Sequence, residues 1–141
     1  MQYFGTAEWH GGLREGKGVL STESQTLQQT PYSFKTRFEG DKGTNPEELI
    51  AAAYAGCFSM AFAAQLEKAG FKAETINTKA TVSLEKVGDG FSITTVHLST
   101  HAKVPHINQE DFDTIAKQAK EGCPVSKLMN ATITFDAKLE I

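Results

Sequence analysis

The apolar segment over residues 45–70 constrains the fold more than any other part of this sequence. Asn45 is a good helix N-cap, Pro46 suits the first helical position, and Gly70 can end a helix that runs to Lys68. Ala, Leu and Phe side chains point in nearly every direction around this helix, so most of its surface needs to be covered. The sequence therefore predicts a central helix around which the other elements pack.

The segments on both sides of this helix show the alternation of apolar and polar residues that is typical of β-strands. The expected strands cover residues 3–9, 18–22, 32–38, 76–85, 91–104 and 132–141. The apolar phase slips between Ile93 and Val96, which predicts a bulge or a change of buried face. A second, amphipathic helix is expected over residues 108–120. This order of elements predicts the α+β class, with antiparallel sheets packed on helices.

Composition narrows the class of protein further. The 141 residues show no internal repeat and no linker, which predicts one domain over residues 1–141. Charged residues make up 22%, the net charge is −3, and Lys and Arg are scattered, so we expect no binding to nucleic acid or to a membrane. The first residues lack the pattern of a secretory signal, and the expected location is the cytoplasm.

The two cysteines are the first candidates for chemistry. A stable structural disulfide is not expected in a reducing cytosol, so the thiols are either inert core residues or a redox pair. Pro124 at the first position of a short helix places Cys123 at its N-cap, where unpaired N–H groups and the helix dipole lower the pKa of a thiol. The alternative is that Cys123 has no redox role and is simply tolerated at the N-cap. The residues alone leave both interpretations open.

Cys57 lies in the middle of the central helix, among apolar neighbours. Burial alone would raise the pKa of its thiol and make it inert, so reactivity requires a fixed cation from elsewhere in the fold. Arg37 is the candidate for this cation, although a surface arginine on a strand is the alternative. His97 and His101 share a strand face but lie about 13 Å apart at strand rise, so we expect no metal site.

Four stretches of the sequence resemble the OsmC/Ohr family, the osmotically inducible and organic-hydroperoxide-resistance proteins. They are residues 44–49 (TNPEEL), residues 51–60 (AAAYAGCFSM), residues 34–40 (FKTRFEG) and residues 122–126 (GCPVS). The last two match the OsmC branch. The likeness covers nearly the whole chain at the expected spacings, and no key position departs from the family pattern.

The resemblance implies an intertwined α+β homodimer that reduces organic hydroperoxides with thiols and without a metal or other cofactor. By position, Cys57 matches the peroxidatic cysteine and Cys123 the resolving one. Arg37 matches the activating arginine, and Glu47 matches the carboxylate that holds it. The resemblance further implies that a dithiol recycles the disulfide; in related Ohr proteins this reductant is a lipoylated protein.

An apolar lining should explain a preference for organic hydroperoxides. The candidate residues for binding the substrate are Tyr54, Phe58 and Met60, together with the predicted strand face that carries Phe34 and Phe38. Two other functions stay open at this point. One is a module that binds a hydrophobic ligand, and the other is a redox sensor that forms a disulfide without turnover.

Helix geometry adds an expectation about assembly. Glu47 and Cys57 are ten residues apart on one predicted helix, which places them about 15 Å apart along its axis. One guanidinium cannot contact both groups of the same chain at that spacing. We therefore expect Glu47 and Cys57 of one site to come from different subunits.

Overall fold

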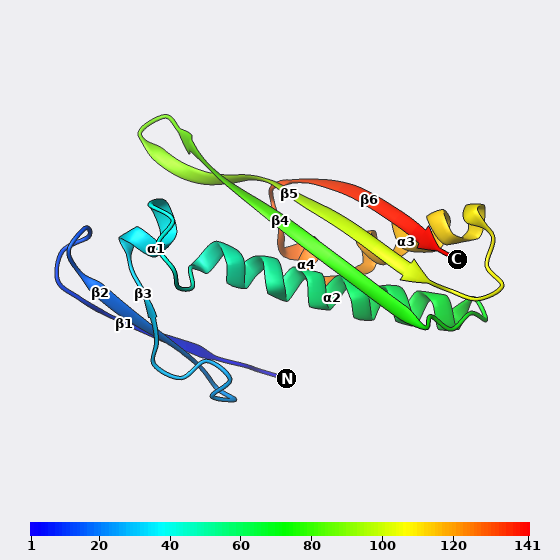
Figure 1. Ribbon diagram of the computed structural model, residues 1–141, viewed down its shortest axis with the longest axis horizontal. Coiled ribbons are helices and arrows are strands. Elements are labelled where there is room, and N and C mark those ends of the chain that lie inside the picture. The colour runs from blue at the N-terminus through cyan, green and yellow to red at the C-terminus, as the bar shows by residue number, and fades with distance from the viewer. The chain divides into compact units, whose positions relative to one another are not determined.

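The chain forms two compact units, each with its own three-stranded sheet. The computed structural model describes residues 1–141, grouped as Met1–Leu49 and Ile50–Ile141. The first unit holds the sheet β1-β2-β3 and the second the sheet β4-β5-β6 (Figure 1). Helix α2, Pro46–Lys68, begins in the first unit and runs on through the second. The predicted α+β class and the predicted long helix are both confirmed.

The sheet of the first unit is antiparallel, and a glycine in its central strand allows close packing of two aromatic rings. Strands β1 (Gly5–His10), β2 (Lys17–Thr22) and β3 (Thr30–Tyr32) pair in that order. Gly18 lies opposite Trp9 on one side and Tyr32 on the other, and a Cβ atom here would approach the Tyr32 ring to 2.4 Å. Glycine at this position therefore lets the two aromatic rings pack at 5.5 Å between centroids.

The predicted strand over residues 32–38 is wrong. Strand β3 ends at Tyr32, and the next residues form the short helix α1, Phe34–Phe38. The cause is a capping box: the Ser33 hydroxyl accepts from the Thr36 N–H, and the Thr36 hydroxyl accepts from the Ser33 N–H. Phe34 and Phe38 then stack at 4.8 Å, because residues four apart share a helix face as well as a strand face.

In the second unit, β4 (Thr75–Val87) and β5 (Gly90–Lys103) form a long antiparallel hairpin. Its register shifts where Ser83 pairs with Thr95 but Leu84 pairs with Ile93, which leaves Thr94 as the extra residue. This irregularity confirms the bulge predicted from the phase slip before Val96.

The third strand of this sheet corrects the prediction of purely antiparallel sheets. Strand β6 (Thr132–Glu140) runs parallel to β5. Helices α3 (Gln109–Gly122) and α4 (Pro124–Leu128) connect the two strands, and a helical crossover returns the chain to the same end of a sheet. The second sheet is therefore mixed.

One face of α2 forms the centre of the hydrophobic core. Tyr54, Phe58, Phe62 and Leu66 recur every fourth residue, and each is fully buried. They pack with buried residues of β5, of α3 and of the segment between them, which are Val96, Leu98, Ala102, Val104, Phe112, Ile115, Ala116 and Ala119. Phe62 lies 5.4 Å from Phe112, and Phe58 lies 5.5 Å from Phe135, ring centroid to centroid.

A chain of hydroxyl groups also fixes α2 against the second sheet. Ser59 bonds the Ala55 carbonyl and the Thr78 hydroxyl, each at 2.8 Å. Thr78 in turn contacts the fully buried Thr100 hydroxyl at 3.0 Å. Each of these polar groups therefore has a partner, as burial requires.

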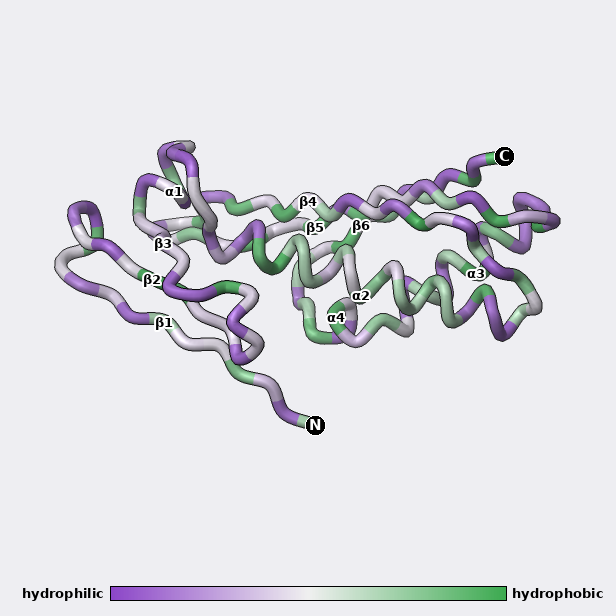
Figure 2. The backbone as a smooth tube through the Cα atoms, turned by 60° about the horizontal axis from the view of Figure 1, so that its bottom comes forward, coloured by the Kyte–Doolittle hydropathy of each residue, from purple (hydrophilic) through white to green (hydrophobic).

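The opposite face of α2 is not covered within the second unit. Met60 is 77% exposed, and the small residues Ala52, Ala53, Gly56 and Ala64 are exposed beside it. The expectation that most sides of the helix are covered is therefore not met within this unit. Apolar residues lie along much of α2 (Figure 2), and the helix is long and apolar enough to cross a membrane. One of its faces packs against the chain's own sheet.

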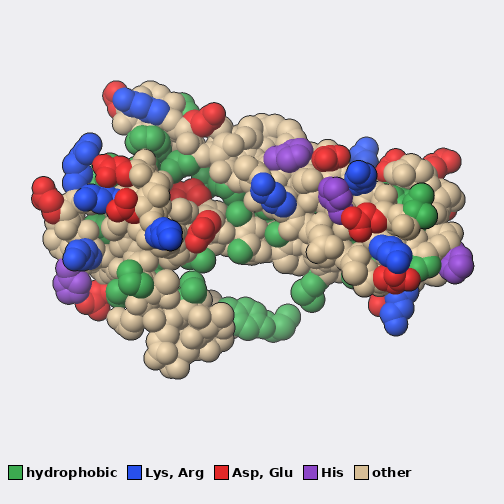
Figure 3. All heavy atoms as spheres, in the orientation of Figure 1, with side chains coloured by type: hydrophobic (Ala, Val, Ile, Leu, Met, Phe, Trp, Pro, Cys, Tyr) green, Lys and Arg blue, Asp and Glu red, His purple; other side chains and the backbone are tan.

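Charged side chains of both signs alternate over the surface that Figure 3 shows, without a broad basic patch. On the second unit, an ion pair joins Lys103 to Glu74, and the His101 ring lies 3.8 Å from the Glu140 carboxylate. Solvated pairs of this kind contribute little to stability.

Truncation of the central aromatic contact tests this core. Phe62→Ala should lower the free energy of unfolding by about 3–5 kcal/mol, because it removes a fully buried ring and leaves a cavity. Urea unfolding measures the loss. The control is Glu67→Ala, an exposed position on the same helix, which should change the free energy by less than about 0.5 kcal/mol. Equal effects of the two substitutions would contradict this packing.

Candidate active site

The structure brings the two cysteines together. Cys57 comes from the middle of α2 and Cys123 from the loop before α4, and their Sγ atoms lie 2.7 Å apart. Both are free thiols; Cys123 is fully buried and Cys57 is partly exposed. Their separation of 66 residues along the chain gives no hint of this contact. Two adjacent reduced thiols are the arrangement that a reversible disulfide requires.

The ends of two helices hold Cys123 in place. Its N–H donates to the Ala119 carbonyl and ends α3, while its own carbonyl accepts from the Lys127 N–H in α4. Pro124 follows at the start of α4, as the sequence predicts. The thiol, however, forms no capping hydrogen bond with α4. It points to Cys57 instead, so the dipole argument made for Cys123 does not describe its contacts.

The surroundings of Cys57 disfavour its thiolate. Burial raises the pKa of the Cys57 thiol, and the hydrogen bond with Cys123 raises it further. A backbone hydrogen bond from Val125, in the first turn of α4, acts in the opposite direction. The unit that contains both thiols therefore holds Cys57 protonated, and a nucleophilic sulfur needs an additional positive charge.

A tyrosine and a serine form a polar contact near the two thiols. The Tyr54 hydroxyl lies 2.5 Å from the Ser126 hydroxyl, which joins α2 to α4. Burial raises the pKa of Tyr54, and the charges of ionised Cys123 and Cys57 add to this effect. The phenol therefore keeps its proton through the neutral range. No pattern in the sequence pairs these two residues.

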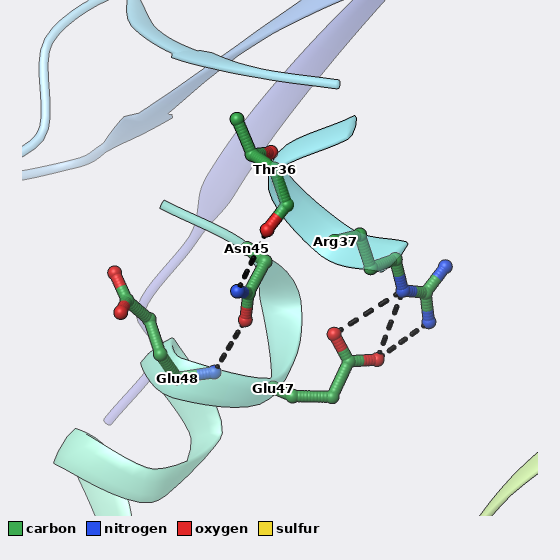
Figure 4. Close-up of polar contacts among 5 residues, drawn as sticks. All are labelled: Thr36, Arg37, Asn45, Glu47 and Glu48. Carbon is green, nitrogen blue, oxygen red and sulfur yellow. Dashed lines mark hydrogen bonds and ion pairs between the residues drawn. The ribbon is translucent and has the colours of Figure 1, made fainter. Parts of the chain in front are cut away.

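Arg37 and Glu47 form the second polar pair of interest, in the first unit. The Arg37 Nη2 and Nε atoms donate to Glu47 Oε1 at 2.6 and 3.0 Å, and Nε lies 3.2 Å from Oε2 (Figure 4). Glu47 is only 8% exposed, so the guanidinium is held by a nearly buried carboxylate. The pairing agrees with the roles that the resemblance implies for these two residues.

Local contacts explain why Arg37 and Glu47 meet. Asn45 caps α2 by accepting from the Glu48 N–H at 2.8 Å, and its Nδ2 donates to the Thr36 carbonyl at 3.2 Å (Figure 4). One side chain therefore links the start of α2 to α1, which carries Arg37. The first turn of α2 then presents Glu47 to the guanidinium.

Two apolar cavities lie beside these groups, one in each unit. The cavity next to Arg37 has a volume of about 300 Å³ and is lined by Trp9, Leu13, Tyr32, Ser33, Phe34, Arg37 and Phe38. The cavity beside α4 has a volume of about 440 Å³ and is lined by Ile50, Ala53, Ile93, Val96, Val125, Leu128, Met129, Asn130 and Ala131. Both can take the hydrocarbon part of a small molecule.

The substrate-binding residues predicted on α2 are not among those that line these two cavities. Tyr54 and Phe58 are fully buried in the core, and Met60 is on the uncovered face of α2. Helical spacing alone could not separate these positions, because Tyr54, Phe58 and Met60 all flank Cys57 on α2. The cavity beside α4 is lined by apolar residues, such as Val125 and Leu128, that the sequence analysis did not single out. The motif around Cys123 was the only signal in this segment.

His97 and His101 contact different residues and do not share a partner. His97 contacts Thr134, and His101 pairs with Glu140, both across the β5–β6 ladder. No group of three or more His, Cys, Asp or Glu side chains is placed to hold a metal ion.

The thiol contact predicts how the reduced protein responds to a mild oxidant. Diamide should convert Cys57 and Cys123 to an intramolecular disulfide without unfolding, because their sulfurs are already adjacent. Mass spectrometry should show the loss of two hydrogen atoms and no covalent dimer. Cys123→Ser is the control, since its remaining thiol has no internal partner. Disulfide-linked dimers as the main product of the unaltered protein would contradict this geometry.

Comparison with known proteins identifies the family of this chain. Peroxiredoxin OsmC from Escherichia coli is 54% identical over 136 residues, which cover 96% of this chain and 95% of that protein. An organic hydroperoxide resistance protein from Xanthomonas axonopodis pv. citri is 30% identical over 86% of this chain and 84% of its own length. The crystal structure of an organic hydroperoxide resistance protein OsmC from Legionella pneumophila superposes with a TM-score of 0.70 at 25% identity, covering 100% of this chain and 99% of that one. The family model for OsmC-like proteins matches residues 39–138, and the chain belongs to this family.

Proposed function

We propose that this protein reduces organic hydroperoxides to alcohols through a Cys57 sulfenic acid and a Cys57–Cys123 disulfide. The observation that carries the proposal is the pair of reduced thiols with sulfurs 2.7 Å apart. The relatives named peroxiredoxin OsmC and organic hydroperoxide resistance protein support the same chemistry. The cytoplasm, where dithiol reductants are available, is the location that suits this cycle.

The cycle has three steps. The Cys57 thiolate attacks the distal oxygen of the hydroperoxide, the O–O bond breaks, and the alkoxide takes a proton and leaves as the alcohol. Cys57 is then a sulfenic acid. Cys123 attacks its sulfur, an S–S bond forms, and the hydroxyl group leaves as water. A dithiol finally reduces the disulfide by thiol exchange and is itself oxidised to a disulfide.

The first step needs the positive charge that the surroundings of Cys57 lack. Burial and Cys123 hold the pKa of Cys57 up, and a guanidinium beside the sulfur would bring it down by favouring the thiolate. Arg37 is suited to this role, because Glu47 fixes its guanidinium through Nε and Nη2 and leaves Nη1 outside that pairing. We therefore assign activation of Cys57 to Arg37 and orientation of Arg37 to Glu47.

The Arg37 of a site should come from the other subunit of a dimer. Arg37 is bound to Glu47 of its own chain, and Glu47 and Cys57 lie ten residues apart on α2, about 15 Å along its axis. The uncovered apolar face of α2 supports a homodimer, since Met60 and its small neighbours would be buried there. This assembly is the intertwined dimer that the sequence resemblance implies.

The apolar cavities supply a reason for preferring organic hydroperoxides over hydrogen peroxide. A hydrocarbon substituent gains about 25 cal/mol for each Å² that it buries, and hydrogen peroxide has no such surface. The cavity beside α4 includes Val125, whose backbone bonds Cys57, so a substituent there would lie close to the reacting sulfur. We assign the tail of the substrate to the residues of this cavity in place of Tyr54 and Phe58.

Turnover distinguishes this enzyme from the two other functions. With excess dithiol, the protein should consume many equivalents of cumene hydroperoxide and should consume hydrogen peroxide more slowly. Cys57→Ser should abolish consumption because it removes the nucleophile. A ferrous-iron xylenol orange assay follows the peroxide. Consumption of a single equivalent would favour a redox sensor, and no consumption would favour a module that only binds apolar ligands.

Mixed dimers test the origin of the arginine. Arg37→Met and Cys57→Ser should each be inactive alone, and equal amounts that are unfolded and refolded together should regain about a quarter of wild-type activity. The gain arises because half of the dimers are mixed and each carries one site with an intact Cys57 and an intact Arg37. Absence of any gain, with mixed dimers confirmed by native mass spectrometry, would place both residues of a site on one chain.

A further inference from the structure

The contact between Tyr54 and Ser126 has no part in the peroxide chemistry proposed above. Tyr54 lies three residues before Cys57 on α2, and Ser126 lies three residues after Cys123. Their hydroxyl groups are 2.5 Å apart, and the Tyr54 side chain is fully buried. This hydrogen bond therefore joins the same two segments as the thiol contact.

Helix α4 is held by contacts of this kind together with the packing of Val125 against the core. It has only five residues, none of which is fully buried, and a helix of that length is not stable by itself. Three polar contacts join the segment 123–128 to α2: the thiol pair, the Val125 N–H with the Cys57 sulfur, and Tyr54 with Ser126. The first two change when the Cys57 sulfur is oxidised. Only the third involves no sulfur.

We propose that Tyr54 and Ser126 are positioning residues that hold Cys123 against Cys57 while Cys57 is a sulfenic acid. The inference rests on the proposed function and extends it to the second step of the cycle. At this step, two reactions compete for the sulfenic acid. Attack by Cys123 forms the S–S bond and releases water, whereas a second hydroperoxide transfers an oxygen atom and leaves a sulfinic acid and an alcohol.

The position of α4 decides this competition, because only the first reaction depends on where Cys123 lies. A thiol held next to its target reacts at a high effective concentration, and movement of α4 would lower that concentration. Oxygen transfer from a second hydroperoxide to the Cys57 sulfenic acid uses no atom of Cys123. Loss of the Tyr54–Ser126 bond should therefore slow disulfide formation and leave the first reaction with peroxide unchanged.

Ser59 provides a matched control on the same helix. It lies two residues after Cys57, but its hydroxyl bonds the Ala55 carbonyl and the Thr78 hydroxyl, and neither belongs to α4. Ser59→Ala removes a hydrogen-bonded hydroxyl of α2 just as Tyr54→Phe does. A general loss of packing would thus affect both variants, whereas the proposed role affects only one.

The resolving step can be measured without peroxide. Reaction of the reduced protein with 5,5′-dithiobis(2-nitrobenzoate) should first form a mixed disulfide at Cys57, the more exposed thiol, with release of one thionitrobenzoate. Attack by Cys123 then releases the second. Tyr54→Phe and Ser126→Ala should each slow the second release by about three- to tenfold, the range expected for one buried hydrogen bond. The first release should stay at the wild-type rate.

Three further variants define the result. The double variant should be no slower than either single one, because both remove the same bond. Ser126→Thr keeps a hydroxyl and should restore the wild-type second phase. Ser59→Ala should also retain it. A second phase that is unchanged in Ser126→Ala, or slowed equally in Ser59→Ala, would overturn the proposal.

A peroxide experiment links the pair to the enzyme cycle. Without reductant, increasing cumene hydroperoxide should convert Cys57 to the sulfinic acid at about three- to tenfold lower concentration in Tyr54→Phe and Ser126→Ala than in the wild type. Mass spectrometry of the Cys57 peptide measures disulfide against sulfinic acid. A wild-type protein that does not react with hydroperoxide would refute the proposed function, and the two-phase thiol assay would still decide the role of Tyr54 and Ser126.

Discussion

The packing of one face of α2 against the second sheet determines where every reactive group of this unit lies. Tyr54, Phe58, Phe62 and Leu66 fill that face, and the rings of Phe58 and Phe62 contact Phe135 and Phe112 from elements that follow much later in the chain. With these contacts made, helical geometry leaves little freedom for Cys57, which lies at the border of the buried stripe. The same packing explains why the opposite face, with Met60 at its centre, is left apolar and uncovered.

This placement of Cys57 has an electrostatic consequence. A sulfur at the edge of an apolar core, next to a second thiol, stays protonated, since burial and the shared hydrogen bond both oppose the thiolate. The Arg37–Glu47 pair carries the compensating charge on a different unit of the fold. In the function proposed above, Arg37 of a second chain supplies the charge that Cys57 needs, so two chains together would form each site.

Much of the fold could be predicted from local signals. Asn45 with Pro46, Asn108, and the Cys123-Pro124 step each start a helix where the sequence places it, because caps act through neighbouring backbone groups. The phase slip before Val96 located the bulge, because an extra residue in a strand shifts the alternation of apolar side chains that follow it. The prediction of a strand over residues 32–38 failed because Phe34 and Phe38 fit the repeat of a strand as well as that of a helix. The capping box at Ser33 favours the helix. The direction of β6 depends on the helical crossover, which strand alternation does not encode.

The site was less predictable than the fold, and the reason lies in long-range packing. The resemblance named Cys57, Cys123, Arg37 and Glu47, but the chain's own residues gave a distance only for Glu47 and Cys57, about 15 Å along one helix. The choice of Tyr54 and Phe58 as substrate contacts assumed that proximity to Cys57 along α2 places a side chain in a pocket. Both side chains are instead fully buried in the core, where an aromatic ring contributes more to stability than it would in a surface pocket.

The buried phenol at Tyr54 then needs a partner for its hydroxyl, since a lone hydroxyl in the core would be costly. Ser126 is that partner, so the requirement of the core also fixes the helix that follows the second cysteine. One buried residue thereby connects the stability of the fold to the alignment of the two sulfurs.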